Sequence, residues 1–89
     1  MTVDDYIKAR GRVLDVVENN IKFATTYEQI NEQVVVLSKE MSFCIQLQST
    51  YYSYKNDCEM LRNRNSKLFN IAAEKGVKFL DSLDSLDLA

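Results

Sequence analysis

The chain has 89 residues, of which 46% are hydrophobic and 27% are charged, and its formal net charge is −2 at pH 7. This length allows a single domain over residues 1–89, and the hydrophobic fraction is too high for a disordered chain. The slightly acidic balance argues against nucleic-acid and membrane binding, which rely on basic surfaces. With no Pro and only two Gly, a β fold would lack its turn residues, which predicts an all-α protein.

The first predicted helix spans residues 3–22. Thr2 and Asp5 have the spacing of a capping pair at its start. Apolar residues then recur along one side of the helix: Val3, Tyr6, Ile7, Val13, Leu14, Val17 and Ile21. Gly11 interrupts the middle, either as a tolerated glycine or as a site where a neighbouring helix approaches closely.

The second and longest predicted helix spans residues 26–62. Thr25 and Glu28 have the spacing of a capping box at its start. An apolar stripe then follows at spacings of four and three: Tyr27, Ile30, Val34, Leu37, Met41, Cys44, Leu47, Tyr51, Tyr54, Cys58 and Leu61. The spacing from Cys44 to Leu47 is three residues, where the alternating pattern requires four. The helix therefore either bends at Ser49 or absorbs this irregularity and continues. We favour a continuous helix, because the stripe resumes without Gly or Pro.

The third predicted helix spans residues 66–86. It follows a run of polar residues at 62–66, Arg-Asn-Arg-Asn-Ser, which predicts a joint between helices. Its apolar face contains Leu68, Ile71, Ala72, Phe79, Leu80, Leu83 and Leu86. From residue 80 onward, Leu-Asp-Ser repeats with a period of three.

These elements predict either a three-helix bundle around a long central helix or an extended helical hairpin, with coiled-coil-like packing in both cases. A helix over residues 27–61 would be roughly 52 Å long, and the outer helices, at roughly 30 Å each, cannot cover it from one flank. The outer helices can pack on both halves of it, or a second chain can supply the missing cover. We expect a homodimer or a complex with a larger protein.

The residue types that carry most enzyme chemistry are absent or badly spaced. The chain contains no His, the commonest general base and metal ligand. Cys44 and Cys58 lack the spacing of a zinc or redox pair, and on one continuous helix they would be roughly 21 Å apart. Glu28 and Glu32 fit a solvated helix face. We therefore expect no catalytic, cofactor-binding or metal-binding residues, and reduced cysteines in a cytoplasmic protein.

Four apolar residues, Val35, Val36, Phe43 and Ile45, fall outside the stripe. We expect Val35, Val36 and Phe43 to form the partner-binding surface with Phe43 as its anchor, because an exposed apolar patch usually marks a contact. The competing explanation is that the first helix covers them.

The acidic C-terminal segment is the second candidate for a partner-binding site. Leu83 and Leu86 would be the apolar anchors, and Asp84 and Asp87 would steer the segment toward a basic rim. The alternative is that the leucines pack in the bundle and the helix end frays.

The predicted function is that of a non-catalytic, protein-binding helical module, a small intracellular regulator, inhibitor or chaperone. The alternative is a structural component that assembles into homo-oligomers. A second alternative is a nucleic-acid-binding regulator, whose contacts would come from Lys55, Arg62, Arg64 and Lys67. We expect no membrane span, because the longest uninterrupted apolar run covers only residues 34–37.

Overall fold

In the computed structural model the chain forms three α-helices joined by two short connections. The backbone is described for residues 2–88, and the side chains for residues 2–82. The elements in chain order are α1 (Val3–Phe23), α2 (Tyr27–Thr50), the short 3-10 helix η1 (Tyr52–Tyr54) and α3 (Lys55–Leu88). The backbone between residues 2 and 88 contains no strand, so the prediction of an all-α fold is confirmed.

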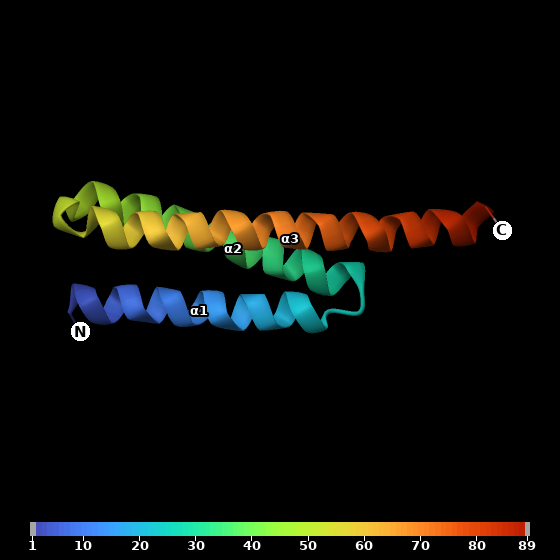
Figure 1. Cartoon of the computed structure of the whole chain (residues 1–89), viewed down its shortest axis with the longest axis horizontal. Helices are drawn as coiled ribbons and strands as arrows, with labels where there is room; N and C mark the ends of the chain where they lie inside the picture. Colours follow the sequence, from blue (N-terminus) through green and yellow to red (C-terminus); the bar gives the residue numbers. More distant parts are fainter. Residues whose placement is uncertain (1, 89) are drawn as a thin grey trace.

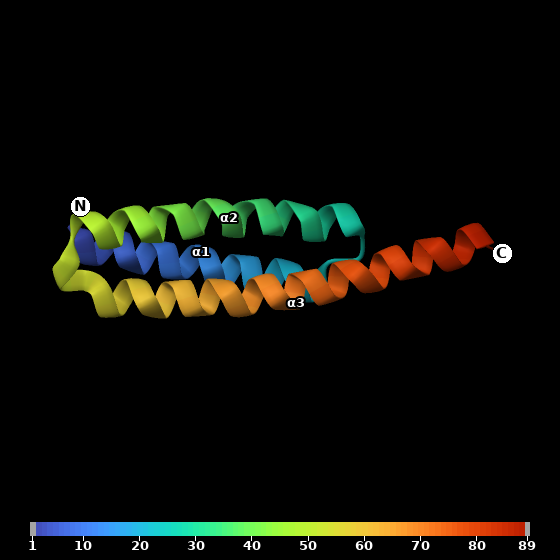
Figure 2. The same cartoon turned by 90° about the horizontal axis from the view of Figure 1, so that it is seen from above.

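Consecutive helices run antiparallel and form an elongated bundle, 56 × 19 × 15 Å between Cα atoms. Helices α2 and α3 form a hairpin, and α1 lies against both of them (Figures 1 and 2). Because α3 has 34 residues and α2 only 24, α3 continues past the connection between α1 and α2. Its C-terminal part projects from the bundle as a single helix, which Figure 2 shows from above.

Side-chain caps set the starts of α1 and α2. Thr2 Oγ1 accepts a hydrogen bond from the Asp5 N–H, and the Asp5 carboxylate accepts one from the Thr2 N–H, which confirms the predicted capping pair. At α2 the capping box is formed by Thr26 and Gln29, one residue after the box predicted at residues 25–28. The local signal therefore identified both helix starts to within one residue.

The prediction of a continuous helix over residues 26–62 is wrong, because α2 ends at Thr50. The next residue, Tyr51, has φ −125° and ψ 80°, outside the helical region. In the last turn of α2 the hydroxyls of Ser49 and Thr50 donate to the carbonyl of Gln46, at 3.0 and 2.9 Å. Ser38 and Ser42 form the same type of bond within α2, where the helix continues, so these bonds do not by themselves end it. The chain reverses at Tyr51, whose backbone leaves the helical region.

The predicted joint at residues 62–66 is also wrong, because α3 passes through this segment without interruption. Its polar side chains contact the neighbouring helices. Asn65 is only 3% exposed and donates from Nδ2 to the Leu37 carbonyl of α2, at 2.8 Å. Arg62 Nη1 donates to Gln48 Oε1, at 2.9 Å. The polar run thus bonds α3 to its neighbouring helices. The third helix begins at Lys55 and not at residue 66, where we predicted its start.

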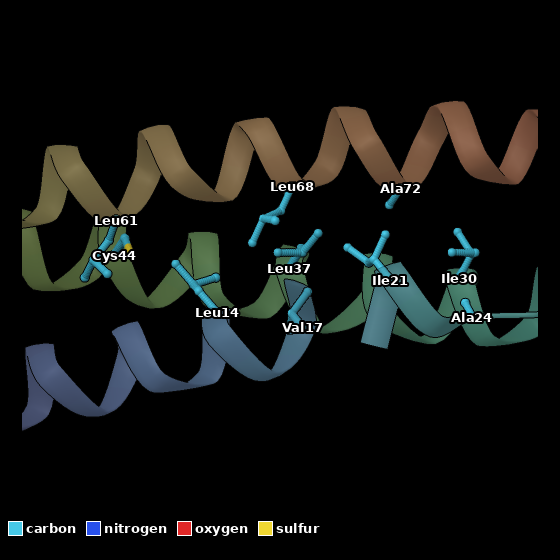
Figure 3. Packing of buried hydrophobic residues seen from close by; sticks show 10 residues of the cluster. All are labelled: Leu14, Val17, Ile21, Ala24, Ile30, Leu37, Cys44, Leu61, Leu68 and Ala72. Atoms are coloured by element: carbon cyan, nitrogen blue, oxygen red, sulfur yellow. The ribbon is translucent and has the colours of Figure 1, made fainter. Parts of the chain in front are cut away.

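The core lies along the line where the three helices meet (Figure 3). It contains residues of each of the three α-helices and of the α1–α2 connection: Leu14, Val17, Ile21, Ala24, Ile30, Leu37, Cys44, Leu61, Leu68 and Ala72. The stripe predicted over residues 26–62 supplies both sides of the α2–α3 contact, because the chain folds back at Tyr51. In this region the chain itself covers the stripe, for which a second chain was one of our two alternatives.

Candidate protein-binding surface

The surface is hollowed at the end of the bundle where α1 begins and α2 ends. This hollow is open to solvent and has a volume of about 400 Å³. Its lining comes from the first turns of α1, the last turns of α2 and the cap residue between α2 and η1: Thr2, Val3, Tyr6, Phe43, Gln46, Leu47, Thr50 and Tyr51. Phe43, the predicted anchor, is among them and is 39% exposed. Three aromatic rings are therefore accessible at one site, from which an apolar side chain of a partner could exclude water.

Arg10 lies over the rings of two residues that line the hollow. Its guanidinium carbon is 5.1 Å from the ring centroid of Tyr6 and 5.0 Å from that of Phe43. Its Nη1 also donates to Glu40 Oε1, at 2.9 Å. The Arg10 side chain is 23% exposed and that of Glu40 is 7% exposed. A largely buried ion pair thus joins α1 to α2 and holds a cation against both rings.

The ionisation of Glu40 depends on the same guanidinium. Burial raises the pKa of Glu40, and the positive charge of Arg10 opposes part of that rise. Glu40 Oε2 and Arg10 Nε are buried and have no hydrogen-bond partner within the part of the protein whose side chains are described. Removal of Arg10 would therefore leave a buried carboxyl group without compensation.

The three predicted partner residues of α2 differ in burial and in position. Val36 is partly buried and packs against the core, and its role in partner binding stays a prediction. Val35 is 48% exposed but does not line the hollow. Successive helical residues point about 100° apart, which separates the two valines. Of the three, only Phe43 lies at the hollow.

The predicted partner residues of the C-terminal segment are Leu83, Asp84, Leu86 and Asp87. All four lie outside the residues whose side chains the structure describes, although α3 continues to Leu88. Their role in partner binding stays a prediction from the sequence.

Two of the four basic residues of the alternative nucleic-acid site form bonds between helices. Arg64 contacts three groups of α1: Gly11 O, Asp15 Oδ1 and Glu18 Oε2. The hydrogen bonds to the two carboxylates raise the pKa of Arg64. Arg62 is bonded to α2 as described above, whereas Lys55 and Lys67 are exposed. Both arginines therefore bond neighbouring helices of the bundle. Of the four basic residues, the two lysines stay accessible for a contact with phosphate.

Both cysteines are buried free thiols. Cys44 lies on α2 and Cys58 lies on α3. The expectation that both lie on one continuous helix is therefore wrong. Burial raises the pKa of Cys44 to about 11, and burial likewise raises the pKa of Cys58. Both thiols are therefore protonated at neutral pH, which is typical of core residues.

Within the described residues, no group of three or more His, Cys, Asp or Glu side chains is arranged to hold a metal ion. None of the helices, as far as they are described, is both long enough and apolar enough to span a membrane.

Sequence reasoning missed the groups that surround Phe43. Tyr6 and Tyr51 were assigned to apolar helix faces. Tyr51 lines the hollow together with Tyr6 because α2 ends at Thr50, and that helix end was not predicted. Glu40 had a usable signal, because it follows Leu37 by three residues and precedes Cys44 by four. That spacing puts a charged residue on the buried face of α2, where a partner charge is needed.

No protein-family model matches this chain, and no curated protein or solved structure is similar enough to it to count as a match. The interpretation of the hollow therefore depends on its own geometry and chemistry.

Proposed function

We propose that this chain is a non-catalytic, protein-binding helical module, a small regulator, inhibitor or chaperone that contacts a larger protein through the hollow at the α1–α2 end. The observation that carries the proposal is the aromatic lining of this hollow, in which Phe43 and Tyr51 are exposed and Tyr6 is half-buried around one opening. Aromatic residues dominate the binding energy of protein interfaces, because they bury much apolar area with few rotatable bonds.

The chemistry of the hollow suits a large apolar side chain presented by a helix or loop of the partner. Its volume of about 400 Å³ is near the lower end of the roughly 300–1,000 Å³ typical of ligand pockets. The phenol hydroxyls of Tyr6 and Tyr51 and the amide of Gln46 can bond polar groups at the rim of such a contact. The Arg10–Glu40 pair supports the site by keeping two rings in place before the partner arrives.

A displayed library of helical peptides tests the proposal and requires no identified partner. Peptides selected on the full chain are measured against Phe43→Glu and against the matched control Val35→Glu, which makes the same change at another exposed position of α2. We expect Phe43→Glu to weaken binding by roughly a hundredfold, the scale of an anchor residue, and Val35→Glu to leave it within about twofold.

A second variant separates loss of binding from loss of fold. Tyr51→Ala removes a ring from the same hollow at a residue outside the three α-helices. It should weaken the same peptides while the circular dichroism spectrum stays that of the wild type. Peptides that bind both hollow variants as tightly as the wild type, or that shift NMR signals only elsewhere on the protein, would show that the hollow is not the binding site.

A further inference from the structure

A groove lies between α2 and α3, on the side of this pair that faces away from α1. Figure 2 views this side, with α1 behind the other two helices. The groove is open to solvent and has a volume of about 440 Å³. Its described lining comes from the middle parts of α2 and α3: Leu37, Ser38, Met41, Asn65, Ser66, Phe69 and Asn70. It shares none of these residues with the hollow, so it is a separate site. We call it the α2–α3 groove.

The walls of the α2–α3 groove are apolar and its rim is uncharged. Leu37 is buried, Met41 is partly buried, and the Phe69 ring is 43% exposed. The polar side chains at the exposed rim are those of Ser38, Ser66 and Asn70. None of the described lining residues carries a charge. The groove therefore suits an uncharged group, because an ion placed there would lose hydration without meeting an opposite charge.

Asn65 contributes a polar atom to the floor of the groove. The residue is only 3% exposed, and its Nδ2 donates to the Leu37 carbonyl. This hydrogen bond orients the amide, so its Oδ1 points away from that carbonyl. Among the residues whose side chains are described, none donates to Oδ1. The polar atoms sealed from solvent without a partner are Arg10 Nε and Glu40 Oε2, and Asn65 Oδ1 is not one of them. The Asn65 oxygen is therefore an unpartnered acceptor that is reached through the groove.

This acceptor determines which apolar group fits the groove best. A purely apolar occupant would remove water from Oδ1 and return no hydrogen bond, which lowers affinity. A tryptophan side chain combines a large apolar ring with one indole N–H donor, and it brings no acceptor that would need a donor of its own. Tryptophan is also among the residues that contribute most to the binding energy of protein interfaces. The chain contains no Trp, so a second copy cannot supply this group.

We propose that the α2–α3 groove receives a tryptophan side chain of a partner protein. The indole N–H donates to Asn65 Oδ1, and the ring packs against Met41 and Phe69. The contact uses a face of the bundle that α1 leaves open and that the hollow does not reach. It thus goes beyond the proposed function.

A displayed library of helical peptides that share one fixed tryptophan tests this proposal. Peptides are selected on the full wild-type chain, and those that bind Tyr51→Ala equally well are kept, because they do not use the hollow. In each kept peptide the tryptophan is replaced by 1-methyltryptophan, which keeps the indole ring but lacks its N–H. We expect this change to weaken binding roughly tenfold, because Asn65 Oδ1 is then covered without a donor. The protein itself is unchanged, so a folding defect cannot explain the loss.

A pair of variants of α3 locates the contact on the protein. Phe69→Ala removes a wall of the groove and should weaken the kept peptides roughly tenfold. Ile71→Ala is the matched control, because Ile71 is exposed on the same helix but does not line the groove. It should leave the affinity within about twofold. Both residues lie outside the core cluster, so both variants should keep the circular dichroism spectrum of the wild type.

Three results would overturn the proposal: 1-methyltryptophan peptides that bind as tightly as their parents, equal affinities of Phe69→Ala and Ile71→Ala, or loss of every selected peptide in Tyr51→Ala. A dimer in sedimentation equilibrium that Phe69→Ala dissociates would also overturn it, because a second copy would then cover the groove. Peptides that bind at the hollow should be unaffected by Phe69→Ala. The failure of one proposal is therefore distinguishable from the failure of the other.

Discussion

Replacing Arg10 by Met should destabilise the protein by about 2–4 kcal/mol at pH 7. Methionine keeps an unbranched apolar side chain but removes the charge, so the Glu40 side chain, which is 7% exposed, loses its cation. Removing one partner of a fully buried pair costs about 3–5 kcal/mol. We expect a smaller cost because the Arg10 side chain is 23% exposed, so water reaches this side of the pair.

The cost should depend on pH in a defined direction. The pKa of Glu40 is raised above its ordinary value of 4.5, so between that value and the folded-state pKa the folded protein binds more protons than the unfolded chain. The stability that Glu40 contributes is therefore lost as the pH rises through this window. Arg10 is the group that lowers this pKa, so in Arg10→Met the window extends to higher pH. The variant should regain stability when it is acidified toward pH 4.5.

Urea denaturation followed by circular dichroism, at pH 5 and pH 7, measures these effects in a double-mutant cycle. The set is the wild type, Arg10→Met, Glu40→Met and the double variant. The double variant should be more stable than Arg10→Met, because apolar replacement of a whole buried pair is often neutral or stabilising. A loss below about 1 kcal/mol for Arg10→Met, equal at both pH values, would show a solvated pair and refute the reasoning.

Two further predictions concern α3 and α1. Asn65→Ala should lower the free energy of unfolding by about 1–3 kcal/mol in urea denaturation, because it deletes a buried hydrogen bond to the Leu37 carbonyl. The exposed control Asn63→Ala should change it by less than about 0.5 kcal/mol. Equal losses of stability in the two variants would contradict this prediction. Gly11→Ala should stabilise the protein by about 0.5–1 kcal/mol, because the new Cβ meets nothing closer than Leu61 Cδ2 at 4.0 Å. A lowered melting temperature would mean that α1 and α3 approach each other more closely there.

The features that the sequence predicted correctly are local ones. The all-α fold follows from the missing turn residues, and the start of α1 follows from the spacing of Thr2 and Asp5, which contact each other directly. The chain reversal at Tyr51 lies close to the bend at Ser49 that we gave as the alternative to a continuous helix. We favoured a joint at residues 62–66 instead, because a polar run resembles a turn when its partners are unknown. Asn65 finds its partner 28 residues away, and Arg64 contacts Gly11 at a separation of 53 residues. No local pattern contains that information.

The candidate site shows the same division. Phe43 was identified because it falls outside the apolar stripe, a property of α2 alone. The hollow around it also requires Tyr6 from α1 and Tyr51 beyond the end of α2, so it exists only once the chain reverses after Thr50. A continuous helix over residues 26–62 has no end at Thr50, so that prediction could not include the hollow.

The same polar contacts also fix the register of α3 against its neighbours. A shift or rotation of α3 would separate Asn65 from the Leu37 carbonyl and Arg64 from Asp15 and Glu18. A buried amide without a partner costs about 1–3 kcal/mol, so these contacts oppose such a movement. The short connection at residues 51–54 also ties the start of α3 to the end of α2. Because α3 is the longer of the two helices, its C-terminal part therefore extends past the α1–α2 connection.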